Sequence, residues 1–450
     1  MTTQFEFIIA DPSVNLKPGK SSLIRSRCMQ GKNKREGSRR SVQSRKKERA
    51  ARHETNVDPL VTIPPSLHNF VADRFASHVD AEGQELLLKA FAYNLTNQSM
   101  SPLDRCVDFD RVEADFFTWL YTDSAFLHCI LSISYAVNDI VVPTWNGQPG
   151  KKVVSHLRDT LSILAKKMDA SNAHEDEAVL YVVINLALLA AVYGDWAAAS
   201  AHFAGLHKIV QLRGGIDFLR TRPIIHFKLD RLDLAWSLSS GKAPLFLHPV
   251  ISWDPLRKSL HIKPDLYKPP ANWDVRLTSV FCDFQYLTTT INENVHMHAR
   301  YNATCFQSIL STLQSRLIHL AGTLTHPIEE LIRLSLLVFL TTTFKVPGRK
   351  IPYTWIAKKL AAAYASAEDL INSQETLQLW VIIMAAISVS SSDEPWLVCA
   401  WRVGHCATSW NETRKKLSSV MWIDCIHDQR GEIAHNMLTQ TLIEIERTGE

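Results

Sequence analysis

Apolar residues recur at intervals of three and four along most of the chain, and this periodicity is the strongest restriction on its fold. In "PSLHNFVADRFASHV" (65–79), one predicted helical face carries Leu67, Phe70, Val71, Phe75 and Val79. Further helical segments are predicted at about 111–138, 151–169, 175–193, 196–213, 224–239, 273–291, 296–321, 327–345, 353–373, 376–391, 394–410 and 429–447. Alternating strand patterns are almost absent after residue 10, so the sequence predicts an all-α body.

The stretch "YGDWAAASAHFAGLHKIVQLRGGIDFL" (193–219) predicts how neighbouring helices meet. Gly194 ends one helix, Asp195 caps the next, and Gly214-Gly215 terminates it. The alanines between them allow a neighbouring helix to approach closely. We therefore expect an irregular multi-helix domain of packed antiparallel helix pairs. A tetratricopeptide array is not predicted, because no repeat near 34 residues is sustained.

A strongly basic segment precedes this body and contains "SRRSVQSRKKERAARHE" (38–54). Residues 17–52 hold 14 Lys and Arg but only two acidic residues, which leaves 35 basic and 43 acidic residues elsewhere. Few apolar side chains lie in 17–57, so burial cannot offset the entropy of ordering and we expect disorder there. The segregation of charge suggests an arm with its own binding partner.

The predicted organisation has four parts. A short N-terminal motif containing "FEFII" occupies 1–16, the disordered basic arm 17–57, a proline-punctuated linker 58–65 and an all-helical domain 66–450.

Cysteine usage and hydropathy favour a soluble intracellular protein. The eight cysteines are scattered without a CxxC pair, and most lie in apolar helical patterns, which indicates reduced, buried thiols. No secretory signal is recognised at the start. The longest apolar run, "AVLYVVINLALLAAVY" (178–193), is shorter than the roughly 20 residues of a membrane span. We expect it to form a helix buried on all sides.

No motif for catalysis, for a cofactor or for a metal is recognised, so we expect no enzyme and no cofactor. His296 with His298, and Cys399 with His405 and Cys406, lack the two close ligand pairs of a structural zinc site. Core thiols and surface or satisfied histidines are the expected interpretation. The acidic pairs Asp176-Glu177 and Glu329-Glu330 are expected at helix starts, and the tryptophans in core packing, although a few could line a ligand pocket.

Three interpretations of the basic arm remain open. The spacing "RR SVQS RKKER" fits a nuclear-import address, the charge could contact nucleic acid without sequence preference, or the arm could be a solvated tail. The candidate residues for import or nucleic-acid contact are Arg39, Arg40, Arg45, Lys46, Lys47 and Arg49.

Several stretches together resemble the fungal-specific transcription factor domain family. The segment 194–219 resembles its helical hallmark, and "DFFTWLYTDSAFLHCILSISYAVND" (115–139) resembles its early segment. "LLVFLTTTFKVPGRKIPYTWIAKKL" (336–360) and "LQLWVIIMAAISVSSSDEPWLV" (377–398) are similar to its late segments. The opening, with its FxF motif leading into a basic arm, resembles a subgroup of the family. The six-cysteine zinc cluster of many members is absent, so no metal-ligating or base-reading residue carries over.

The resemblance implies an all-α regulatory domain, a nuclear location and no catalysis. The expected partners are other transcription factors or coregulators, with homo- or heterodimerisation and non-specific DNA contact through the arm, and no membrane. A scaffolding or small-molecule-sensing helical protein without a direct DNA role is the alternative.

Overall fold

A computed structural model gives the fold of the helical body within the unit Ile63–Glu450. It describes residues 75–95, 102–108, 114–140, 142, 145–246, 251–256, 265–344, 350–351, 353–403 and 409–448. The expected N-terminal motif, disordered basic arm and linker all lie outside these residues.

The body is all-α, as the periodicity predicts. Its fifteen described α-helices are α4 (Ala81–Leu95), α5 (Ala114–Thr122), α6 (Ser124–Ile140), α7 (Lys151–Met168), α8 (Glu177–Tyr193), α9 (Trp196–Leu212), α10 (Pro223–Ser240), α11 (Val275–His296), α12 (Ala303–His319), α13 (Pro327–Thr341), α14 (Thr354–Asn372), α15 (Glu375–Ser388), α16 (Pro395–Arg402), α17 (Trp410–Val420) and α18 (Asp424–Thr448). Short 3-10 helices are η1 (Pro102–Arg105), η2 (Ala173–Glu175) and η3 (Ile216–Thr221). The strand content described is one parallel two-residue pair, β1 (Val107–Asp108) with β2 (Tyr301–Asn302).

The junction between α8 and α9 confirms the predicted capping. Gly194 ends α8 in the left-handed conformation, with φ of 76°. The Asp195 carboxylate then accepts the backbone N–H of Ala198 at 3.0 Å and starts α9. At the other end, Gly214 and Gly215 also have positive φ, of 92° and 88°, which a side chain would disfavour.

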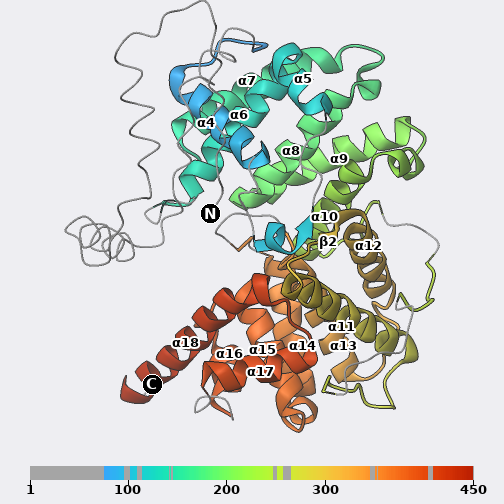
Figure 1. The fold of residues 1–450 in the computed structure, drawn as a ribbon, viewed down its shortest axis with the longest axis vertical. Coiled ribbons are helices and arrows are strands. Elements are labelled where there is room, and N and C mark those ends of the chain that lie inside the picture. Colours follow the sequence, from blue (N-terminus) through green and yellow to red (C-terminus); the bar gives the residue numbers. More distant parts are fainter. Residues whose placement is uncertain are drawn as a thin grey trace, which may run out of the picture. The chain divides into compact units, whose positions relative to one another are not determined.

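Helices α4 to α9, coloured blue to green in Figure 1, gather around a first hydrophobic core. Phe126 of α6, Tyr181 of α8 and Phe203 of α9 are among its fully buried side chains. Twelve of the seventeen residues of α8 are buried, which confirms the expectation of a helix enclosed on nearly all sides. A search of the described helices finds none with the length and apolar character needed to span a bilayer.

Helices α11 to α18 surround a second hydrophobic core. Trp380 of α15, Trp401 of α16 and Phe339 of α13 are fully buried in it. Residues 102–108 also belong to this core although they precede α5, because β1 pairs with β2 and Val107 is buried beside it.

Helix α10 contributes to both cores. Leu232 and Trp236 lie in the first core, whereas Leu234 and Leu238 lie in the second. The alternation explains why this helix shows no single apolar stripe: two of its faces are covered by different groups of helices.

Some predicted boundaries were wrong. Residues 75–80, expected to continue a helix from 65, are not helical, and α4 begins at Ala81 instead. The helix expected at 111–138 is two helices separated by Asp123, whose carboxylate accepts the N–H of Phe126 at 2.9 Å and so starts α6. The last predicted segment, 429–447, begins earlier, at Asp424, and α17 was not predicted as a separate helix.

Candidate functional site

The site residues predicted from sequence cannot be placed by the structure. Arg39, Arg40, Arg45, Lys46, Lys47 and Arg49 all lie outside the described residues. The import and nucleic-acid interpretations of the arm therefore remain predictions.

Of the two weak metal-ligand patterns, His296 with His298 does not belong to a group of three possible ligands among the described residues. His296 ends α11 and is exposed, as is His298, so both are surface histidines as expected. Cys399 is exposed on α16, not a core thiol, and His405 and Cys406 lie outside the described residues. Of the six described cysteines, all are free thiols, but only Cys106 and Cys129 are buried, so the expectation of burial was wrong for the others.

The acidic pairs lie at helix starts as predicted. The Asp176 carboxylate caps α8 by accepting the N–H groups of Ala178 at 2.8 Å and Val179 at 3.3 Å. Glu329 and Glu330 lie in the first turn of α13, where they complement the helix dipole.

A pocket of about 240 Å³ lies between the ends of α13 and α15, the residues that precede α14, and α18. Its apolar wall includes Phe344, Ile351, Tyr353, Ile387, Ile433 and Met437. Its hydroxyl groups come from Thr341 and Thr342 at the end of α13, from Ser388 at the end of α15 and from Ser392 beyond it. This volume is slightly below the 300 Å³ or so at which typical ligand pockets begin, so a small metabolite-sized molecule would fit. No tryptophan is among the residues found to line it.

Two cations lie at this pocket, and no acidic side chain is among its described lining residues. The Lys350 ammonium turns inward and donates hydrogen bonds to the carbonyl oxygens of Ser390, at 3.0 Å, and Ala386. Burial lowers the pKa of Lys350, and the nearby Arg430 lowers it further. Burial also lowers the pKa of the Arg430 guanidinium. An anion placed between these groups would relieve part of the cost of their burial.

Uncompensated polar groups adjoin the pocket. Tyr353 is 3% exposed, and its hydroxyl has no hydrogen-bond partner among the described residues. The same holds for the hydroxyl of Ser390. Buried polar atoms without partners cost free energy, so a ligand able to bond them would gain affinity.

Sequence reasoning missed these pocket residues. Lys350 and Tyr353 belong to the segment 336–360, which was singled out for its resemblance, but nothing in the spacing links them to Arg430, about 80 residues later. The pocket exists because helices distant in sequence pack together, and single-sequence periodicity does not report that.

Comparisons with models of protein families, with curated proteins and with solved structures found no match for this chain.

Proposed function

We propose that the chain is a nuclear transcription regulator similar to the fungal-specific transcription factor domain family. The observation that carries the proposal is the segregation of charge, with 14 basic and two acidic residues in 17–52 ahead of a body with an acidic excess. The resemblance of 194–219 supports it, because this segment folds as α9 with its caps and η3. The all-α body is also the fold that the resemblance implies.

In this proposal the arm provides location and electrostatic affinity, and the body provides contacts with partners. Lys and Arg side chains that neutralise phosphates bind in a salt-sensitive manner and carry little sequence information. Specificity would come from a partner, either another transcription factor bound as a heterodimer or a coregulator. No catalytic step is part of the proposal.

Chromatin occupancy tests the proposal most directly. Tagged full-length protein in its native host is compared with a deletion of residues 17–52. Discrete peaks that disappear on deletion are expected if the arm brings the protein to DNA or into the nucleus. Peaks that persist would assign recruitment to the helical body. Absence of peaks from stably expressed full-length protein would overturn the transcriptional function.

A substitution experiment separates import from folding. Changing Arg39, Arg40, Arg45, Lys46, Lys47 and Arg49 to Gln should abolish nuclear accumulation and leave the thermal midpoint of the body unchanged. The matched control changes six exposed basic residues of the body, namely Lys151, Lys166, Lys208, Lys358, Arg402 and Lys415. Nuclear retention of the arm variant, or equal loss in the control, would contradict an import role for the arm.

The pocket favours a second candidate function, the sensing of a small molecule. Two cations among the lining residues, apolar walls and the unpartnered Tyr353 hydroxyl suit a compact anion with an apolar part, such as a small aromatic or aliphatic carboxylate. Such a ligand would join α13, α15 and α18, whose side chains line the pocket.

Benzoate and octanoate are suitable probes, with thermal shift and titration calorimetry as readouts. Arg430→Gln should weaken binding about tenfold or more, since a charge-assisted hydrogen bond to a buried cation is lost. Arg402→Gln, at an exposed position on α16, is the matched control. Failure of both anions to bind, or equal binding by both variants, would remove the sensing function.

A further inference from the structure

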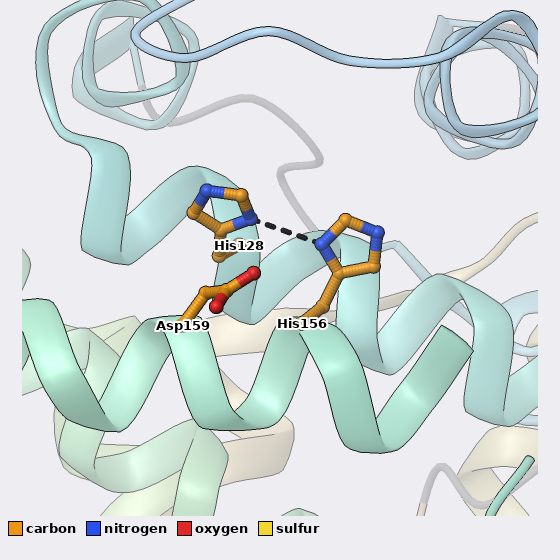
Figure 2. Close-up of side chains that lie close together, drawn as sticks. All are labelled: His128, His156 and Asp159. Atoms are coloured by element: carbon orange, nitrogen blue, oxygen red, sulfur yellow. Dashed lines mark hydrogen bonds between the residues drawn. The ribbon is translucent and has the colours of Figure 1, made fainter. Parts of the chain in front are cut away.

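Helices α6 and α7 form an antiparallel pair that brings two histidines together. The Ser132 hydroxyl of α6 donates to the carbonyl oxygen of Val153 on α7 at 3.2 Å, which fixes the register of the pair. One turn before Ser132 lies His128, and about one turn after Val153 lies His156. Both residues therefore face the same contact between the helices (Figure 2).

The two imidazole rings meet at their Nδ1 atoms, 2.9 Å apart. Asp159 follows His156 by three residues and so lies on the same face of α7, with its carboxylate toward the rings (Figure 2). One ligand atom from each of His128, His156 and Asp159 lies within 4.8 Å of the other two. Among the described residues, no other group of three His, Cys, Asp or Glu side chains brings its ligand atoms this close together.

The surroundings hold the rings in place. Tyr135, about two helical turns after His128 on α6, stacks on His156 with ring centroids 5.5 Å apart and an angle of 12°. The two histidine rings are themselves stacked, with centroids 5.2 Å apart. All three residues of the cluster are half-buried, so a bound ion would be partly shielded and still reachable from solvent.

Burial of the two histidines disfavours protonation of their rings. Burial lowers the pKa of His128, against the opposing effect of Asp159. Burial also lowers the pKa of His156, and its neighbour His128 lowers it further. Neutral imidazole is the form that ligates metals, because the lone pair of the ring nitrogen is free.

Other charged groups around the cluster largely neutralise one another. Lys152 forms an ion pair with Asp80 and lies 3.8 Å from Glu82. The exposed Arg158 places its Nε 3.7 Å from the Asp159 carboxylate. The charged groups around the rings are thus three carboxylates, including that of Asp159, and two cations. Their net negative charge favours a bound cation.

We propose that His128, His156 and Asp159 bind a divalent transition-metal ion of the Zn²⁺ type, leaving a coordination position open to solvent. Two imidazoles and a carboxylate suit zinc better than they suit calcium or magnesium, which prefer oxygen ligands alone. With Zn–N bonds of 2.0–2.1 Å and a tetrahedral angle, the two nitrogens would be separated by about 3.3 Å. The observed pair needs to open by only a few tenths of an ångström.

Metal binding would replace the hydrogen bond between His128 and His156 with two metal–nitrogen bonds, and both rings would stay uncharged. In the metal-free pair, one Nδ1 carries the proton that the other accepts. When both Nδ1 atoms ligate, that proton moves to Nε2 of the same ring, so each imidazole stays neutral. The ion would link α6 to α7 at the site where they cross, and zinc should therefore stabilise the first core.

Titration calorimetry with Zn²⁺ and absorption spectroscopy with Co²⁺ test the site on the full chain. Because exposed Cys305 and Cys399 could bind zinc on their own, both are changed to Ser in the background used. One ion per chain is expected, with visible Co²⁺ bands typical of a four-coordinate site and a rise in thermal midpoint on adding Zn²⁺.

Three variants remove one ligand each: His128→Phe, His156→Phe and Asp159→Asn. The Phe substitutions retain a ring that can stack, and Asp159 is accessible enough for an isosteric change to be tolerated. Each should weaken Zn²⁺ binding by at least tenfold, since loss of even a supporting group around a metal ligand costs about 10–100-fold. His207→Phe on α9 and Asp169→Asn after α7 are the matched controls.

Two results would overturn the proposal. Either no Zn²⁺ binds at micromolar concentration, or it binds equally to the three variants and to the controls, which would mean an adventitious ion only. Far-UV circular dichroism of each variant without metal confirms its folding, and Asp159→Asn alone decides the matter if a histidine variant unfolds.

Discussion

The guanidinium of Arg316 on α12 and the carboxylate of Asp283 on α11 form an ion pair of 2.8 Å, and the two side chains are 1% and 0% exposed. Arg316 also donates to the carbonyl oxygens of Ser252, at 2.8 Å, and Asp254, at 2.5 Å. The other carboxylate oxygen of Asp283, Oδ1, accepts the backbone N–H of Leu256 at 3.1 Å. The pair thus fastens the segment 251–256 to the second core.

Removing one member of this pair should be costly. Arg316→Met removes the guanidinium that pairs with the buried Asp283 carboxylate, and such changes lose about 3–5 kcal/mol of unfolding free energy. The double variant Arg316→Met, Asp283→Leu should lose less than the sum of the single changes, because the buried carboxylate is removed together with the guanidinium. Urea denaturation measures both, with the exposed Arg402→Met as control. A loss below about 0.5 kcal/mol for Arg316→Met would contradict this account.

Asp233 of α10 should make stability fall as pH rises. Burial raises its pKa to about 7, although its carboxylate accepts the N–H groups of Leu245 and Phe246, each at 2.8 Å. A raised folded pKa means that the folded state holds the proton more tightly, so this stabilisation is present below about pH 4 and is lost as pH rises through 7.

Asp233→Asn measures that contribution. The unfolding free energy of the unchanged protein minus that of the variant should decrease by on the order of 3 kcal/mol between pH 4 and pH 8. Denaturation at a series of pH values gives this difference. A difference that stays constant over the range would show that Asp233 does not titrate as stated.

His427 of α18 should make stability fall as pH decreases, which is opposite to the effect of Asp233. It is fully buried, its Nδ1 accepts the N–H of Ile423 at 3.0 Å, and its Nε2 lies 2.8 Å from the Thr342 hydroxyl. Burial lowers its pKa to about 3. The contribution is therefore complete above the ordinary value near 6.5 and is lost as pH falls towards 3.

The measurement for His427 is the same series of pH values applied to His427→Gln. The advantage of the unchanged protein over the variant should shrink by about 3 kcal/mol from pH 7 to pH 4. His319→Gln, at a half-buried position on α12, is the control for the loss of an imidazole from the same protein. An advantage that grows on acidification would contradict the sign.

Two helical glycines should respond oppositely to alanine. A Cβ on Gly431 of α18 would lie 2.7 Å from Trp410 and 2.9 Å from Trp422, whereas one on Gly205 of α9 would meet nothing within 4 Å. We expect Gly431→Ala to destabilise by about 1–3 kcal/mol through overpacking. Gly205→Ala should stabilise by about 0.5–1 kcal/mol, because alanine loses less backbone entropy. Thermal denaturation of both variants tests this, and equal effects would refute it.

Local signals accounted for most of the helices. Asp176, Asp195 and Gly194 act within a few residues of themselves, so their capping roles could be predicted from the sequence. The boundary at Asp123 was missed although its signal is local, because this capping carboxylate starts a new helix inside a continuous apolar pattern. The pair β1–β2 joins Val107 to Tyr301, and no local pattern foretells a two-residue strand.

Both candidate sites on the body escaped sequence reasoning for a related cause. His128 and His156 are 28 residues apart, and only the antiparallel register of α6 and α7 makes them adjacent. The spacing of His156 and Asp159 is a usable signal, since three residues place both on one helical face, but it occurs by chance in many helices. Arg430 on α18 and Lys350 in the segment before α14 line one pocket only because α13, α15 and α18 pack together.

The position of α10 has a consequence for anyone dividing this chain. Leu232 and Trp236 belong to one core and Leu234 and Leu238 to the other, so a fragment ending before this helix, or beginning after it, opens an apolar groove in whichever half is retained. A fragment that keeps α10 but lacks the helices of one core exposes the apolar face of α10 that those helices cover. Shortened versions should therefore aggregate on either side of the cut, and heat should melt the two halves together in a single transition.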